Sequence, residues 1–222
     1  MYKYLLFDAD NTLLDFDMAE AQALRETLSL CPIGFTEEIH KRYHIINDLL
    51  WKKLERGETT RDSLKIERFK RLYDEFGMSG DTHGEATAVI YEERLANQGH
   101  VIDGAEYVLS QLSQKYNCYI ITNGIYKIQK NRLSKTSLGK YIKHSFISES
   151  LGFDKPSPVF FDKVVEYIGD NDRSKYLVIG DSLSSDIAGA VNAKMDSVLI
   201  SKERNEIPTY CIKEIRELFS IL

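Results

Sequence analysis

Two kinds of hydrophobic pattern divide the chain. In residues 17–97, apolar side chains recur every three or four residues among polar and charged ones. The positions are Tyr43, Ile46, Leu50 and Leu54, then Leu64, Phe69, Leu72 and Phe76. This spacing predicts amphipathic helices, and nothing in the segment has the alternation or the apolar runs of a strand.

From about Val101 onward, short apolar runs alternate with stretches of helical periodicity. The runs typical of strands are residues 118–122, 144–147, 176–179 and 197–200. Alternation of this kind predicts a parallel sheet with helices on both faces. A further apolar run, residues 3–7, has no strand next to it in sequence and must join the later sheet.

These patterns together predict an α/β protein with an all-helical insertion. The core is a Rossmann-like parallel sheet with helices on both faces, formed by residues 1–15 and 98–222. Residues 16–97 form the inserted helical domain. A chain of 222 residues is long enough for this arrangement and for a full hydrophobic core.

Composition narrows the classes of partner. The net charge is −5 and no long run of Lys or Arg occurs, which disfavours nucleic acid and anionic membranes but leaves a small phosphorylated ligand open. The three cysteines form no CxxC pair, so a thiolate metal site is not expected. Without a signal segment or an 18-residue apolar run, a cytoplasmic location is expected.

Polar side chains follow the predicted strands. They are Asp8 and Asp10, then Thr122 and Asn123, then Lys155, and finally Asp181 and Asp186. Each has an ordinary explanation when taken alone, such as a turn, a helix cap or a solvated charge. Parallel sheets, however, bind ligands at the carboxyl ends of their strands. Because crowded carboxylates repel one another, their joint occurrence at one edge favours a divalent cation.

The order of these motifs resembles the haloacid dehalogenase superfamily. The segment Asp8-Ala-Asp-Asn-Thr12 matches that family's first motif and Thr122 its second. Lys155 matches the third motif, and Asp181 with Asp186 matches the fourth. The match covers the whole chain in order, and the helical insertion after the first motif corresponds to the family's first class of cap.

The resemblance implies a phosphatase mechanism. Asp8 would attack phosphorus to form an aspartyl-phosphate, and Asp10 would act as general acid and base. Mg²⁺ would bind the carboxylates of Asp8 and Asp181 and the backbone carbonyl of Asp10. The presence of Asp10 favours phosphoryl transfer over dehalogenation, although mutases keep both acids.

The remaining motif residues have implied roles in binding. The Thr122 hydroxyl and the Asn123 backbone N–H would bind phosphate oxygens, and Lys155 would offset the negative charge of Asp8 and of the phosphate. Asp186 would support the metal site through bound water or neighbouring backbone. The partner implied is a small phosphorylated metabolite, and the choice between monomer and dimer stays open.

The insertion is the source of substrate specificity in this interpretation. Residues 47–57 and 59–69 look like the caps of bacterial pyrimidine 5′-nucleotidases, and Trp51 would either stack on a base or lie in the cap core. The sequence Thr122-Asn123-Gly124 also occurs in sialic acid 9-phosphate phosphatases. Alternatives are therefore a sugar-phosphate or sialic acid 9-phosphate phosphatase, a phosphomutase, a receiver domain or a non-enzymatic phospho-ligand binder.

Overall fold

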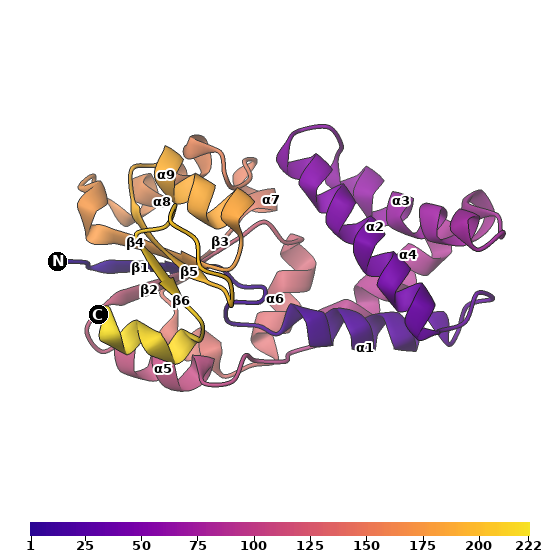
Figure 1. The fold of residues 1–222 in the computed structure, drawn as a ribbon, viewed down its shortest axis with the longest axis horizontal. Coiled ribbons are helices and arrows are strands. Elements are labelled where there is room, and N and C mark those ends of the chain that lie inside the picture. The colour runs from indigo at the N-terminus through magenta and orange to yellow at the C-terminus, as the bar shows by residue number, and fades with distance from the viewer. The chain divides into compact units, whose positions relative to one another are not determined.

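The computed structural model describes all residues, 1–222, and divides the chain into two compact units. The core domain comprises Met1–Phe16 and Gly99–Leu222, and the cap comprises Asp17–Gln98. Both divisions lie one residue further along the chain than the predicted boundaries. Figure 1 shows the cap as a purely helical segment inserted into an α/β core.

A single six-stranded parallel sheet forms the centre of the core domain. Its strands lie in the order β3-β2-β1-β4-β5-β6. Their bounds are β1 Tyr4–Phe7, β2 Asn117–Thr122, β3 His144–Ile147, β4 Tyr176–Gly180, β5 Asp196–Ile200 and β6 Tyr210–Ile212. Strand β1 lies between β2 and β4, with Phe7 in register with Ile120 and Ile179. The predicted fold class is confirmed, including the joining of the first strand to a sheet formed by the distant half of the chain.

Strand β6 was not predicted from sequence. It has only three residues, and Tyr210 and Cys211 are not fully buried. A segment this short, with one buried side chain, has neither the alternation nor the apolar run that marks a strand. Its pairing with β5 at the sheet edge supplies the stabilisation that its own sequence does not show.

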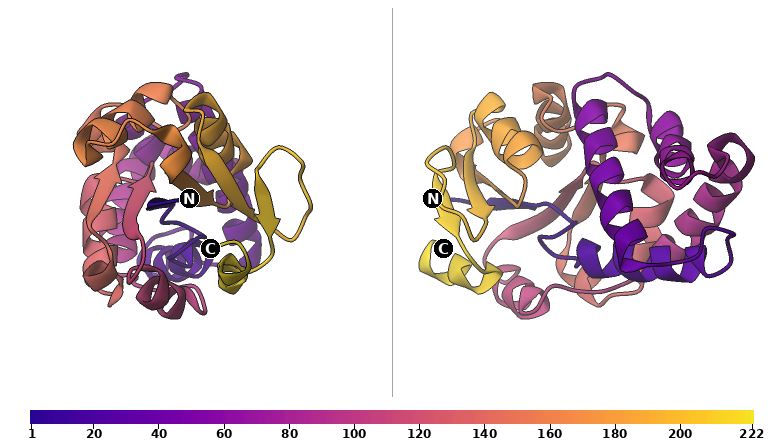
Figure 2. Two further views of the ribbon diagram at one scale, coloured as in Figure 1. Left: turned by 90° about the vertical axis from the view of Figure 1, so that its left-hand side faces the viewer. Right: turned by 45° about the vertical axis from the view of Figure 1, so that its right-hand side comes forward.

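Helices cover both faces of this sheet (Figure 2). The α-helices are α5 Ala105–Leu112, α6 Tyr126–Ser134, α7 Ser148–Leu151, α8 Pro158–Ile168 and α9 Ala188–Asn192. The 3₁₀ turns are η1 Leu138–Tyr141, η2 Arg173–Lys175 and η4 Ile215–Ser220, and η3 Leu183–Ile187 is a π-helical turn.

The two faces of β1 belong to two different hydrophobic clusters. Leu5 and Phe7 pack in a cluster with residues of α5 and η4, whereas Tyr4 and Leu6 pack with residues of α8 and α9. Successive side chains of a strand point to opposite faces, so four consecutive apolar residues serve both layers. Burying each such side chain contributes about 1.5–3 kcal/mol, which fixes the strand that carries Asp8 at its end.

The cap contains four helices, α1 Phe16–Leu28, α2 Glu37–Glu55, α3 Arg61–Glu75 and α4 Gly80–Ala96. Helices α2, α3 and α4 begin at side-chain N-caps formed by Thr36, Thr60 and Ser79. The rings of Tyr43, Phe69 and Tyr91 meet in the cap core with centroids 5.2–5.5 Å apart. Trp51 is only half-buried, so it does not belong to that core.

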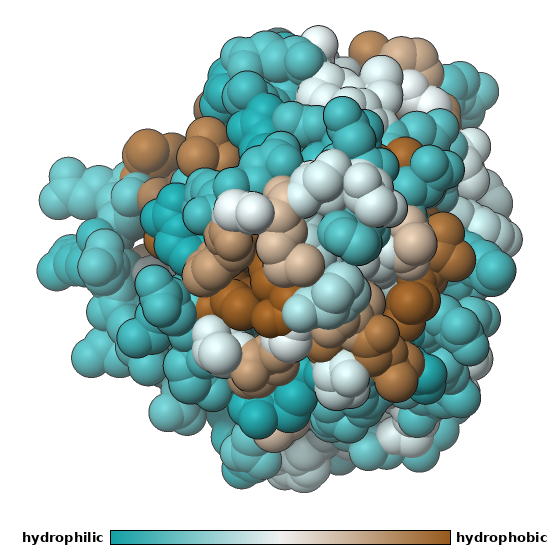
Figure 3. Space-filling model, turned by 90° about the vertical axis from the view of Figure 1, so that its right-hand side faces the viewer, coloured by the Kyte–Doolittle hydropathy of each residue, from teal (hydrophilic) through white to brown (hydrophobic).

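Apolar side chains are also found on the surface. The face shown in Figure 3 is largely hydrophilic, with apolar residues gathered near its middle. Exposed apolar residues are normal on proteins, and no docking function follows from them here. None of the helices combines the length and apolar character needed to cross a membrane.

Candidate active site

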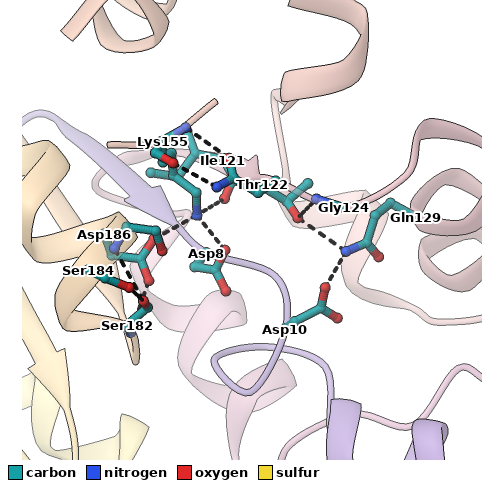
Figure 4. Close-up of polar contacts among 12 residues, drawn as sticks. Asp8, Asp10, Ile121, Thr122, Gly124, Gln129, Lys155, Ser182, Ser184 and Asp186 are labelled. Carbon is teal, nitrogen blue, oxygen red and sulfur yellow. Dashed lines mark hydrogen bonds and ion pairs between the residues drawn. The ribbon is translucent and has the colours of Figure 1, made fainter. Parts of the chain in front are cut away.

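Lys155 links the first and last motifs at the carboxyl ends of the strands (Figure 4). Its ammonium group donates hydrogen bonds to Asp8 Oδ1 at 2.6 Å, to Asp186 Oδ1 at 2.6 Å and to the backbone oxygen of Ile121 at 3.0 Å. Asp8 directly follows β1, and Lys155 is only 1% exposed. The sheet thus brings together residues that are 147 positions apart in sequence.

Burial and charge act against each other on this group. Burial alone would lower the pKa of Lys155, but the charges of Asp186 and Asp8 outweigh it and raise that pKa above its ordinary value. Burial raises the pKa of the Asp8 carboxyl; Lys155 opposes that shift, and the charges of Asp186 and Asp181 add to it. Lys155 therefore stays a cation, and the pKa of Asp8 still lies above its ordinary value because burial and the neighbouring carboxylates outweigh the effect of Lys155.

Three carboxylates form a cluster beside Lys155. One oxygen from each of Asp8, Asp181 and Asp186 lies within 4.8 Å of the others. Burial, followed by the charge of Asp186, raises the pKa of Asp181 to about 7. Asp186 Oδ2 accepts a hydrogen bond from the Ser182 backbone N–H at 3.2 Å, so the side chain also fastens the loop that follows β4.

Gly180 leaves the space that Asp186 occupies. A Cβ atom at position 180 would overlap the carboxylate of Asp186. The side chain is held in that place by Lys155 and by the Ser182 N–H, so it has no cheap way to move aside. The glycine at this strand end is therefore required by packing and is not merely a turn signal.

The charge balance of the site fits a divalent cation. Four aspartates face two buried cations, Lys155 and Arg132, which leaves a formal charge of −2. Carboxylate oxygens in a tight cluster are the ligands that Mg²⁺ prefers in proteins. The residues present therefore suit magnesium.

Thr122 and Asn123 stabilise the edge of the site. Thr122 Oγ1 accepts hydrogen bonds from the Gly124 N–H and from Gln129 Nε2, both at 3.1 Å. The Asn123 side chain donates to the Lys155 carbonyl and accepts from the Lys155 N–H, both at 2.8 Å. The sequence had suggested only a backbone role for Asn123, but its side chain fixes the segment that carries Lys155.

Asp10 lies in a different environment from Asp8. One of its carboxylate oxygens accepts a hydrogen bond from Arg132 Nη1 and the other accepts from Gln129 Nε2. Figure 4 shows the carboxylate turned toward Gln129. Gln129 and Arg132 are each 1% exposed, and the sequence analysis identified neither. The sequence signal that could have revealed them is their i, i+3 spacing on α6, the helix that follows Thr122. Gln129 and Arg132 lie there beside the buried residues Ile128 and Leu133.

Comparison with known proteins agrees with this geometry. A family model for haloacid dehalogenase-like hydrolases matches residues 2–194. The HAD-hydrolase YfnB of Bacillus subtilis is 38% identical over 100% of this chain and 95% of its own length. Pyrimidine 5′-nucleotidase PynA of Streptococcus pneumoniae is 37% identical over the same shares, and pyrimidine 5′-nucleotidase YjjG of Escherichia coli is 29% identical over 100% of this chain and 98% of its own.

A solved structure extends the likeness to three dimensions. The magnesium-bound crystal structure of B. subtilis YfnB superposes with a TM-score of 0.94 over 100% of this chain and 98% of that chain, and it is described as revealing interdomain movement. The chain belongs to the haloacid dehalogenase-like hydrolases. The family predicted from the four motifs is confirmed, as is the prediction that the protein is an enzyme.

Proposed function

We propose that this protein is a magnesium-dependent phosphomonoester hydrolase that works through an aspartyl-phosphate and prefers pyrimidine nucleoside 5′-monophosphates. The observation that carries the chemical part is the Asp8–Lys155 pair. A buried ammonium group holds one oxygen of Asp8 at the end of β1, beside a carboxylate cluster. Holding Oδ1 in this way leaves Oδ2 to act as the nucleophile.

The first step forms a bond between Asp8 Oδ2 and phosphorus and breaks the ester P–O bond. The electron pair of that bond goes to the leaving oxygen, and Asp10 supplies the proton that this oxygen takes up. In the second step, water attacks the same phosphorus while Asp10 accepts a proton from it. The acyl phosphate P–O bond breaks, which restores the Asp8 carboxylate and releases inorganic phosphate.

Binding groups surround this centre. The Thr122 hydroxyl and the Asn123 backbone N–H, at the end of β2, would bind phosphate oxygens, and Lys155 would offset negative charge. Asp8, Asp181 and the Asp10 carbonyl would hold Mg²⁺, with Asp186 in support. When bound, the ion would neutralise charge on the phosphate and so reduce its repulsion from Asp8.

Substrate preference is assigned to the cap. The core residues recognise only the phosphate, so discrimination among esters must come from groups that contact the rest of the substrate. The cap of residues 17–98 is the part of the chain available for this, and two full-length relatives are named pyrimidine 5′-nucleotidases. Interdomain movement described for YfnB supports closure of such a cap over a substrate.

The chemical part is tested by Asp8→Asn, measured with a generic aryl phosphate and magnesium. An amide is a far weaker nucleophile, so we expect turnover to be abolished in a folded protein. Asp103→Asn, at a highly exposed position of the same domain, serves as the control and should retain activity. Near wild-type turnover of Asp8→Asn with magnesium still bound would exclude Asp8 as the nucleophile.

Specificity is tested by kcat/KM on a panel of phosphate esters. The panel sets dUMP and dTMP beside a sialic acid 9-phosphate and phosphoglycolate. We expect the pyrimidine nucleotides to have the highest kcat/KM of the panel. A tenfold preference for either competitor, which corresponds to about 1.4 kcal/mol of transition-state binding, would reject the nucleotidase proposal and leave the phosphatase proposal standing.

A further inference from the structure

We propose that Gln129 and Arg132 are positioning residues for Asp10, whose side chain they hold in one fixed orientation. This inference rests on the proposed phosphatase chemistry and extends it to two residues outside the family motifs named above. Their role is to orient the group that transfers protons. Neither is assigned a contact with the substrate.

The geometry accounts for both oxygens of Asp10. Arg132 Nη1 bonds Oδ1, and Gln129 Nε2 bonds Oδ2. Gln129 Oε1 in turn accepts from Arg132 Nη1 at 3.2 Å, so the two donors also hold each other. A carboxylate bonded through both oxygens to donors on one helix face has little freedom to rotate.

Burial indicates that this arrangement has a purpose beyond surface pairing. The Arg132 side chain is 1% exposed, whereas that of Asp10 is 29% exposed. A guanidinium group withdrawn from water is costly unless a carboxylate compensates it. The core domain thus buries the cation and leaves its anionic partner accessible, which is the arrangement expected where the carboxylate must reach a reactant.

The same helix connects Asp10 to its surroundings in two directions. Gln129 Nε2 also donates to Thr122 Oγ1 at 3.1 Å, which couples the placement of Asp10 to the proposed phosphate-binding loop. The Arg132 guanidinium carbon lies 5.5 Å from the ring centroid of Phe16, the first residue of α1. A Cβ atom at Gly124 would overlap the Gln129 side chain, so the glycine after Thr122-Asn123 provides its space.

The test is a double-mutant cycle between Arg132→Met and Asp10→Asn. Two substrates are compared: p-nitrophenyl phosphate, which has a good leaving group, and the best alkyl ester of the panel, which has a poor one. General acid–base catalysis is typically worth about 10²–10⁴ in rate. We expect Arg132→Met to lower kcat for the alkyl ester by roughly 10- to 100-fold, part of that range, and to lower kcat for the aryl ester much less.

In the Asp10→Asn background, the same change should alter kcat less than about threefold, because residues acting as a unit are not additive. Arg132→Lys should recover part of the loss. The control is Arg216→Met, whose exposed ion pair with Asp103 lies in the same domain, and it should leave kcat unchanged. If Arg132→Met does not fold, Gln129→Met is measured in the same cycle with the same expectation.

Equal losses on both leaving groups, or losses that multiply fully with Asp10→Asn, would overturn the inference and indicate a structural role. An increase in rate in Arg132→Met would also overturn it, because Gln129 and Arg132 would then be holding Asp10 out of the reaction. A wild-type enzyme that hydrolyses aryl and other alkyl esters but no nucleotides would refute only the proposed specificity. A wild type that hydrolyses no ester would overturn both proposals.

Discussion

Replacing Lys155 by Met should destabilise the core domain more than any loss of a surface ion pair would. The substitution keeps an unbranched side chain but removes the ammonium group that bonds Asp8 and Asp186 at 2.6 Å each. Both carboxylates are buried, with Asp186 at 0% and Asp8 at 7% exposure. Without the lysine, two carboxyl groups remain without their cation in a place that water hardly reaches.

The magnitude follows from this burial. Removing one partner of a buried ion pair typically costs about 3–5 kcal/mol, because the other charge stays buried and uncompensated. We therefore expect a loss in that range in the metal-free protein, against a total stability of about 5–15 kcal/mol for a typical protein. Magnesium should return part of the loss; a ligand at 100 times its Kd adds about 2.7 kcal/mol to a protein that binds it only when folded.

Urea denaturation in EDTA and in magnesium measures both effects. Far-UV circular dichroism follows the whole chain, whereas fluorescence follows Trp51, the only tryptophan, which lies in the cap. The control is Lys163→Met, whose pair with Glu166 is exposed on both sides and should contribute little to stability. A loss below about 1 kcal/mol for Lys155→Met in EDTA would refute the conclusion that both carboxylates depend on Lys155.

Three further predictions concern stability. Gly180→Ala should destabilise the protein by about 1–3 kcal/mol in urea denaturation, because the new Cβ overlaps Asp186. The control is Gly139→Ala, whose new Cβ meets nothing within 4 Å and should not destabilise the protein. Equal losses in the two variants would contradict the packing argument. Hydrogen bonding to buried Glu20 raises the pKa of His44, so its stabilisation of the cap is complete below about pH 6.5 and is lost as pH rises through the higher folded-state pKa. The amplitude should lie within about 0.2–1 kcal/mol, since His44 is partly exposed, and Trp51 fluorescence in urea should show it in the wild type but not in His44→Gln. Magnesium should raise the melting temperature of the wild type in proportion to the logarithm of its concentration, and EDTA should reverse this rise. If magnesium leaves the melting temperature of Asp181→Asn unchanged, the assignment is supported. If it leaves that of the wild type unchanged, the assignment is refuted.

The sequence predicted those parts of the fold that depend on strong local patterns. The strand Tyr4–Phe7 is four consecutive apolar residues, and the only place for it is a sheet covered on both faces. Helices α2 and α3 of the cap carry their apolar residues at regular spacing, and Gly57 and Gly77 follow them closely. Strand Tyr210–Ile212 could not be found in this way, because its existence depends on pairing with β5 and not on its own three residues.

The residues of the candidate site also differ in whether a local sequence pattern reveals them. Asp8, Asp10, Lys155 and Asp181 could be found because each lies at a strand end or in a recognisable motif. Arg132 could not, because a single arginine on a helix is usually solvated. Only the folded structure shows that Arg132 is buried and that it donates a hydrogen bond to Asp10.

The two aspartates of the first motif acquire different chemistry from the cations that face them. Lys155 carries a compact charge with three donors, and it bonds Asp8, Asp186 and a backbone oxygen at once, which fixes Asp8 in the buried cluster. Arg132 presents a planar group with donors in fixed directions, and it shares Asp10 with Gln129 at a more exposed place. A fixed, buried carboxylate suits attack on phosphorus, and an oriented, accessible one suits proton transfer. The division of labour between two identical residues is therefore set by the partners that the segment between α7 and α8 and helix α6 bring to them, and not by the residues themselves.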